Sequence, residues 1–109
     1  MSNIKKARYT NAPKLLNQKL SVIKVTGTSK NIKQINFILP KEYGIKKIKE
    51  NLFILFIESK GILATLARLA TNDWVVITED NHVDKIPEEN FDKIITLVDW
   101  YALHKKSKA

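Results

Sequence analysis

Residues 52–66 read Leu-Phe-Ile-Leu-Phe-Ile-Glu-Ser-Lys-Gly-Ile-Leu-Ala-Thr-Leu. The first six, Leu52–Ile57, are apolar on both faces, which is the pattern of a strand buried at the centre of a sheet. Ser59–Gly61 is a tight-turn signal, so we predict a β-hairpin in which Ile62–Leu66 is the second strand. The longer stretch Ile62–Ala70 also fits a helix, because apolar residues recur in it at helical spacing.

Three further elements are predicted before this hairpin. Leu20–Val25 and Ile35–Leu39 are rich in β-branched residues and are predicted to be strands. Pro40 ends the second strand and suits the first turn of a helix, so Pro40–Glu50 is predicted to form a short helix.

After the hairpin, Trp74–Thr78 is predicted to be a strand, followed by an acidic turn. Pro87 then opens a C-terminal amphipathic helix, with Glu88 and Glu89 in its first turn, where the helix dipole favours acids. The apolar residues of this helix recur at i, i+3, i+4, i+7 and i+11: Phe91, Ile94, Ile95, Val98 and Ala102.

The predicted fold class is α+β. It consists of a small, mostly antiparallel sheet, the short helix after Pro40 and the C-terminal helix. The 109 residues suffice for one hydrophobic core. We predict a basic flexible arm over residues 1–19, a single globular domain over residues 20–104, and a basic C-terminal end over residues 105–109.

Charge is strongly segregated along the chain. The first 41 residues hold nine cationic side chains and no acid, whereas Asp73–Asp99 holds eight acids against two lysines. With a net charge of +8, this pattern favours a polyanion as partner, because each lysine that neutralises a phosphate releases counterions. The alternative is a lysine-rich surface that only contacts water. The acidic segment is either a solvated face or a surface for the basic arm of a second copy.

The candidate nucleic-acid-binding residues are the cationic side chains of the arm, the early elements and the C-terminal end, with two neighbouring tyrosines. They are Lys5, Lys6, Arg8, Tyr9, Lys14, Lys19, Lys24, Lys30, Lys33, Lys41, Tyr43, Lys46, Lys47, Lys105 and Lys106. Tyr9 and Tyr43 would stack on bases. The core patterns predict that all four phenylalanines are buried, and Trp100 is expected at a dimer contact or at the rim of the domain.

Several classes of protein are not expected. The chain has no cysteine, so disulfides and thiolate metal sites are excluded. Its longest apolar run, Leu52–Ile57, is too short to span a bilayer, and no secretory signal is visible. We expect a soluble cytoplasmic protein without a cofactor, a metal site or a small-molecule substrate.

Catalysis has little support in the sequence. His82 and His104 are the two histidines, and no His/Cys cluster, Gly-rich phosphate loop or Ser/His/Asp arrangement is visible. Leu52–Ile57 followed by Glu58 and Lys60 looks like half of the site of restriction-type metal nucleases. That site also needs an upstream acid, for which Glu42 and Glu50 are the residues available. The alternative is that Glu58 and Lys60 are ordinary turn residues, and no enzymatic activity is expected.

Residues 22–66 resemble the DNA-binding domain of AbrB-type transcription factors, in which swapped hairpins form a dimer. The matching pieces are Val25-Thr26, Gln-Ile-Asn-Phe-Ile-Leu-Pro-Lys-Glu at residues 34–42, Gly44-Ile45, Leu52–Ile57, Lys60-Gly61 and Ile62–Leu66. The resemblance implies a homodimer in which Lys24, Lys30 and Lys33 contact DNA.

The sequence therefore predicts a nucleic-acid-binding protein, with a small DNA-binding transcription regulator as the first choice. One alternative is sequence-independent binding of single strands. Another is a protein-interaction module or inhibitor that acts through the acidic face or through Trp100-Tyr101.

Overall fold

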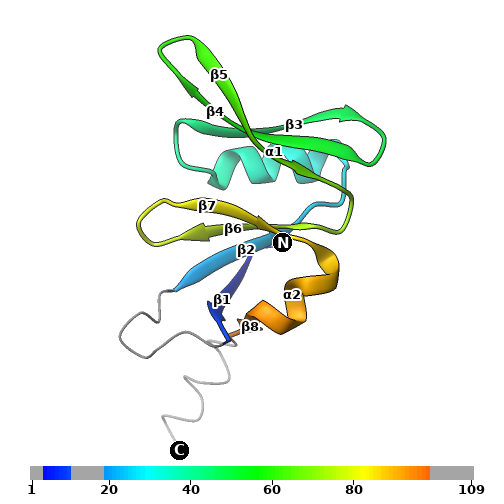
Figure 1. Ribbon diagram of the computed structural model, residues 1–109, viewed down its shortest axis with the longest axis vertical. Coiled ribbons are helices and arrows are strands. Elements are labelled where there is room, and N and C mark those ends of the chain that lie inside the picture. The colour runs from blue at the N-terminus through cyan, green and yellow to red at the C-terminus, as the bar shows by residue number, and fades with distance from the viewer. Residues whose placement is uncertain (1–3, 11–18, 99–109) are drawn as a thin grey trace, which may run out of the picture.

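The structure is a computed structural model that describes residues 4–10 and 19–98 (Figure 1). Its strands and helices, in chain order, are β1 (Lys5–Tyr9), β2 (Leu20–Lys24), α1 (Ser29–Ile38), β3 (Tyr43–Lys49), β4 (Leu52–Ser59), β5 (Ile62–Leu69), β6 (Trp74–Thr78), β7 (Val83–Ile86), α2 (Glu88–Ile94) and β8 (Ile95–Leu97). Neither helix is long and apolar enough to cross a membrane, as far as the described residues go.

The strands form two antiparallel sheets. One has five strands in the order β7-β6-β2-β1-β8, and the other has three in the order β3-β4-β5. The segment from α1 to β5 is inserted between β2 and β6, which are neighbours in the larger sheet. The α+β class is thus confirmed, but the β structure is larger than the one small sheet predicted.

The predicted hairpin is confirmed as β4 and β5. Ser59 lies opposite Ile62, and the two residues between them, Lys60 and Gly61, have φ values of 53° and 79°. Two positive φ angles define the type I′ turn, whose twist matches that of paired strands. Ile62–Leu69 is therefore a strand, and the alternative helix is not formed. The strands predicted at Leu20–Val25 and Trp74–Thr78 are confirmed as β2 and β6.

The strand predicted at Ile35–Leu39 is wrong, because these residues lie in α1 or directly after it. The Thr28 side chain caps this helix by accepting a hydrogen bond from the backbone N–H of Asn31 (3.1 Å). Ile32, Ile35 and Leu39 recur at helical spacing and pack into the core. Burial of this stripe outweighs the weak strand preference of β-branched residues.

The helix predicted over Pro40–Glu50 is also wrong, since Tyr43–Lys49 forms β3. Pro40 follows the end of α1, which agrees with the restriction that proline places on the preceding residue. Gly44 leaves room for the ring of Phe56, the residue opposite it on β4. A Cβ atom at Gly44 would collide with Cζ of Phe56, so a larger residue there would require the ring to move.

Both ends of the described chain differ from prediction. Residues 5–9 of the predicted arm form β1, which pairs with β2 and β8 and buries Ala7. The C-terminal helix begins as predicted, with Glu88 and Glu89 in its first turn, but α2 ends at Ile94. The chain continues as β8, so the C-terminal amphipathic helix is much shorter than predicted. The remainder of the arm and the C-terminal end lie outside the described residues.

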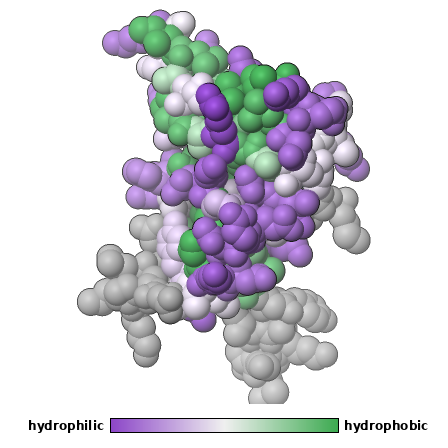
Figure 2. Space-filling model, turned by 45° about the vertical axis from the view of Figure 1, so that its right-hand side comes forward, coloured by the Kyte–Doolittle hydropathy of each residue, from purple (hydrophilic) through white to green (hydrophobic). Residues whose placement is uncertain are grey.

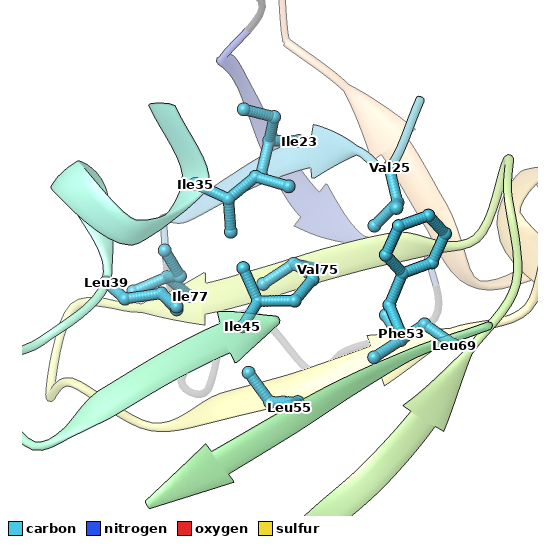
Figure 3. Packing of buried hydrophobic residues seen from close by; sticks show 10 residues of the cluster. All are labelled: Ile23, Val25, Ile35, Leu39, Ile45, Phe53, Leu55, Leu69, Val75 and Ile77. Atoms are coloured by element: carbon cyan, nitrogen blue, oxygen red, sulfur yellow. The ribbon is translucent and has the colours of Figure 1, made fainter. Parts of the chain in front are cut away.

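Two apolar clusters cover the two faces of the five-stranded sheet. The first joins this sheet, α1 and the three-stranded sheet, and its side chains point toward one another in Figure 3. It comprises Ile23, Val25, Ile35, Leu39, Ile45, Phe53, Leu55, Leu69, Val75 and Ile77. The second lies on the α2 side and comprises Ala7, Leu20, Val22, Val76, Ile86, Phe91 and Ile95.

Candidate nucleic-acid interface

The cationic residues of β1 point to both faces of the sheet. Lys5 pairs in register with Val22, whose side chain belongs to the α2-side cluster. Lys6 pairs with Ser21, and its Nζ donates a hydrogen bond to Ser21 Oγ (3.1 Å). Because successive residues of a strand alternate between faces, Lys5 and Tyr9 share one face, and Lys6 and Arg8 share the other. A single flat ligand therefore cannot contact all of them.

Lys5 meets Lys24 at a cavity of about 320 Å³, which we call the Trp74 pocket. Its lining residues are Lys5, Lys24, Thr26 and Trp74. The Lys24 ammonium lies 5.9 Å from the centre of the Trp74 ring, within the range of a cation–π contact. Neither lysine forms an ion pair with an acidic residue of the described chain. The pocket thus combines two unpaired positive charges with an aromatic ring.

Each wall of the Trp74 pocket has a fixed position. Lys24 is paired in register with Trp74 between β2 and β6. The Trp74 ring stacks on Phe91 of α2, with centroids 3.9 Å apart and an interplanar angle of 15°. This stacking fixes the ring plane.

The loop that carries Thr26 is held by the buried side chain of Asn31. Oδ1 of Asn31 accepts hydrogen bonds from the backbone N–H groups of Thr26 (2.9 Å) and Gly27 (3.3 Å). Nδ2 of Asn31 donates to the carbonyl oxygen of Lys24 (2.9 Å). One amide therefore connects the end of β2 to the start of α1, and the pocket has a preorganised rim.

A second basic surface lies on α1. Lys30, Lys33 and Phe37 are spaced by three and four residues, so they share one face of the helix. Phe37 is 88% exposed, and its predicted place in the core is therefore wrong. The core places predicted for Phe53 and Phe91 are confirmed, and Phe56 is half-buried. An exposed ring beside two lysines is an arrangement that suits contact with nucleic acid.

The cationic residues of β3 have other partners. Lys46 lies with its Nζ 5.9 Å from the centre of the Phe56 ring. Lys47 forms an ion pair with Glu50 at 2.7 Å, so its charge is locally neutralised. Lys41 is exposed in the turn before β3.

The two tyrosines proposed for base stacking are both half-buried. Tyr9 packs against the α2-side cluster, and Tyr43 packs against the other. Burial raises the pKa of the Tyr9 hydroxyl, and the nearby carboxylate of Asp84 raises this pKa further. Tyr9 also lines a cavity of about 290 Å³ with His82 and Asp80, whose surroundings are acidic rather than basic.

Acidic side chains of the segment after Asp73 are engaged in local hydrogen bonds. Asp73 accepts from the backbone N–H groups of Ala70 (2.8 Å) and Glu88 (3.1 Å). Glu79 accepts from the backbone N–H of the exposed Lys19 (2.7 Å). Asp80 accepts from the Thr78 hydroxyl, and this bond lowers the pKa of the Asp80 carboxyl. These carboxylates stabilise turns and helix ends.

The residues of the nuclease pattern lie at the end of the hairpin. Glu58 is exposed on β4, and Lys60 is in the turn. The backbone N–H of Glu58 donates to the carbonyl oxygen of Glu42 (2.8 Å), so two carboxylate residues are neighbours there. Within residues 4–10 and 19–98, no group of three or more His, Cys, Asp or Glu side chains could hold a metal ion.

From the sequence, Phe37 was predicted to lie in the core and Trp74 in a strand, and neither was among the candidate binding residues. Trp74 belongs to a strand whose neighbours are apolar, and Phe37 follows Ile35 in a run that resembles a strand. Exposed aromatic rings next to lysines in the sequence were the pattern used to find base-stacking residues. Trp74 and Phe37 lack a neighbouring lysine in the sequence, and they come close to Lys24 and Lys33 only in the folded chain. The predicted residues Lys14, Lys105 and Lys106 lie outside the described residues, as does Trp100.

Comparison with known proteins does not assign the chain to a family. Searches of protein-family models, of curated proteins and of solved structures found no significant match to the chain. The resemblance of residues 22–66 to AbrB-type domains therefore stays a prediction from the sequence.

Proposed function

We propose that this protein binds nucleic acid and that double-stranded DNA is its ligand, in the role of a small transcription regulator. The observation that carries the proposal is the meeting of Lys5 and Lys24 at the Trp74 pocket without an acidic partner. Positive charges that lack a counterion in the protein can take a phosphate and release the ions bound to it.

The second basic surface supports the same proposal. Lys30 and Lys33 are exposed on α1, and the chain runs directly from Lys24 through Thr26 into this helix. Phosphate contacts fix the position of a protein on DNA but carry no sequence information. Sequence specificity would require contacts to base edges, for which exposed side chains of α1 are the available candidates.

Single-stranded nucleic acid is the second candidate ligand, and the Trp74 pocket favours it. The volume of about 320 Å³ is at the small end of the range of ligand pockets. It could admit one unpaired base against the indole, with its phosphate near Lys5 or Lys24. Stacking of a base on an aromatic ring contributes about 1–3 kcal/mol to single-strand binding.

Binding to a labelled duplex and to a labelled single strand at two salt concentrations tests the proposal. We expect both affinities to fall as salt rises, and the duplex to bind more tightly. The double variant Lys5→Glu/Lys24→Glu should bind more weakly. Its salt slope on duplex DNA should be shallower by about 1.8, because each phosphate contact contributes about 0.9.

The matched control is Lys49→Glu/Lys60→Glu, which changes the net charge of +8 by the same four units at exposed positions of the other sheet. It should retain most of the affinity. Equal losses in the two double variants would show that the Trp74 pocket is not the contact. The absence of binding to either ligand at low salt would contradict the proposed function itself.

Tryptophan fluorescence separates the two candidate ligands. The chain has two tryptophans, so a Trp100→Phe variant reports on Trp74 alone. A base that stacks on the indole should quench this emission. Quenching by the single strand and not by the duplex would favour the second candidate.

A further inference from the structure

The three-stranded sheet has an outer face that points away from the hydrophobic core. Its core side is formed by alternate residues of the strands, namely Ile45, Phe53, Leu55 and Leu69. Because successive side chains of a strand point to opposite faces, Lys46, Ile54 and Arg68 lie on the outer face. These three residues form one row across the sheet, since Ile54 pairs with Lys46 on one side and with Arg68 on the other. Figure 2 shows hydrophobic side chains gathered in the upper part of the molecule, where β3–β5 lie in Figure 1, with hydrophilic side chains beside them.

The next row of the outer face contains the ring of Phe56. This residue pairs with Gly44 of β3 and with Thr65 of β5. A Cβ atom at Gly44 would collide with the ring, so the ring lies over the backbone of β3 at a position where glycine leaves room for it. Phe56 is half-buried, and Nζ of Lys46 lies 5.9 Å from the centre of its ring. The outer face thus carries an aromatic ring laid against the sheet, with a cation beside it.

Two cations flank the centre of the outer face. Both Lys46 and Arg68 are exposed, and neither forms an ion pair within the part of the chain that the structure describes. They stand on the two outer strands of the sheet, so their Cα atoms are about 10 Å apart at the usual strand spacing. Glu58 lies on the same face, but on the other side of Phe56, toward the β4–β5 turn. An anionic chain is therefore attracted to the side of the ring that carries Lys46 and Arg68.

We propose that the outer face binds single-stranded nucleic acid, with one base stacked on Phe56 and the adjoining phosphates at Lys46 and Arg68. The cations alone would suit any polyanion, including an acidic peptide. The ring beside them favours a nucleic acid, because an unpaired base offers a flat π-face that an acidic side chain lacks. The bases of a duplex are stacked on one another, so they do not offer this face. Every base has a π-face, and the site therefore accepts different sequences.

This inference rests on the proposed function in one respect, namely that the protein binds nucleic acid, but it uses a different surface. The Trp74 pocket lies on the five-stranded sheet, whereas the outer face belongs to the three-stranded sheet. The protein would then hold a duplex on one sheet and an unpaired strand on the other. The two surfaces can be changed separately, and the two proposals can fail separately.

Binding of a labelled oligothymidylate and of a labelled duplex to variants of Phe56 tests the proposal. Phe56→Leu removes the π-face and should raise the dissociation constant of the single strand by about tenfold. Phe56→Tyr keeps a ring and should restore most of this affinity. The duplex should bind both variants as it binds the wild type. Unchanged affinity of Phe56→Leu for the single strand would overturn the proposal, and circular dichroism of each variant checks that the fold is retained.

The double variant Lys46→Glu/Arg68→Glu tests the phosphate contacts. The salt slope for the single strand should become shallower by about 1.4, because each phosphate contact contributes about 0.7 on a single strand. The matched control is Lys60→Glu/Lys93→Glu, which changes the net charge by the same four units at the hairpin turn and on α2. It should keep the wild-type slope. Equal slopes in the two double variants would mean that Lys46 and Arg68 do not contact the phosphates, and the proposal would fall.

Photochemical cross-linking locates the base on the wild-type protein. An oligothymidylate that carries iodouracil should become attached to Phe56 on irradiation, and mass spectrometry of the digested product identifies the residue. Attachment at Trp74 and not at Phe56 would contradict this inference and leave the proposed function standing. Failure of the protein to bind either the single strand or the duplex would contradict both. A changed sedimentation mass in Phe56→Leu, with unchanged affinity for the single strand, would assign the outer face to a protein contact and overturn the proposal.

Discussion

The two edges of the three-stranded sheet are treated differently by the rest of the molecule. On β3, the side chain of Asn36 in α1 closes the edge at Ile45: the Ile45 N–H donates to Oδ1 (2.8 Å), and Nδ2 donates to the Ile45 carbonyl (3.0 Å). Three lysines follow on the same strand, namely Lys46, Lys47 and Lys49. On β5, residues 62–66 are uncharged, and no described strand or helix covers their outer side.

This difference shows how little is needed to close an edge. A single primary amide imitates the donor and acceptor of a neighbouring strand, and the lysines disfavour the approach of a second chain. The corresponding part of β5 has apolar side chains where β3 has positive charge. The β3 edge is thus closed within the chain by α1, whereas among the described residues no strand pairs with the outer side of β5.

The largest expected effect comes from Phe53→Ala, which removes the support common to both edges. Phe53 lies on the central strand β4, between Lys47 of β3 and Leu69 of β5, and it is fully buried. Its ring also occupies the space beside Gly27 in the loop before α1, where a Cβ atom would lie 3.0 Å from Cζ of the ring. Deleting a buried phenyl ring should lower the free energy of unfolding by about 3–5 kcal/mol, measured by urea denaturation.

Phe37→Ala is the matched control, because it makes the same chemical deletion at an exposed position of α1. It should change the free energy of unfolding by less than about 0.5 kcal/mol. Equal losses in the two variants would contradict the placement of Phe53 beneath both edges.

A smaller effect is expected from Asn36→Ala, which opens the β3 edge. The variant loses both hydrogen bonds to Ile45. Because water can reach part of this site, the free energy of unfolding should fall by only about 1 kcal/mol. Amide hydrogen exchange at Ile45 should become faster, since its N–H is then exposed to solvent.

Asn36→Asp is the control for this change, because a carboxylate retains an acceptor for the Ile45 N–H but offers no donor to its carbonyl. Exchange at Ile45 should be slower in Asn36→Asp than in Asn36→Ala. Unchanged exchange at Ile45 in both variants would mean that Asn36 does not close the β3 edge.

The β4–β5 hairpin could be predicted from the sequence because its signals are local. Leu52–Ile57 is apolar throughout, and Lys60-Gly61 supplies the two positive φ angles of the turn. The secondary structure of Ile35–Leu39 could not be predicted from local signals in the same way. Ile35–Leu39 is rich in β-branched residues and also has helical spacing, so strand and helix remain open until the core selects one.

Pro40 was ambiguous for a related reason. Proline both begins helices and follows their ends, and here it follows α1 rather than opening a second helix. The strands β7 and β8 were missed because each is short and lies next to turn or helix signals. Tertiary pairing with β6 and β1 defines them, and a local pattern cannot show it.

The candidate site was predictable in its charge but not in its arrangement. The acid-free stretch identified Lys5 and Lys24 among many other cations. Their meeting depends on the pairing of β1 with β2 and of β2 with β6, and Trp74 is fifty residues from Lys24 in the chain. A sheet register between distant segments is fixed by burial of both faces, which a single sequence does not reveal.

The smallest effect expected is that of Lys85→Ala, which removes a hydrogen bond that β7 of the larger sheet makes to β5. The Lys85 side chain donates to the Arg68 carbonyl in an exposed contact between the two sheets. Its removal should lower the free energy of unfolding by about 0.5 kcal/mol, because water replaces the lost donor. Lys85→Arg retains a donor and should recover most of this loss. A loss of stability as large as that of Asn36→Ala would mean that β5 is closed by the body of the protein as firmly as β3 is, and the contrast between the two edges would not hold.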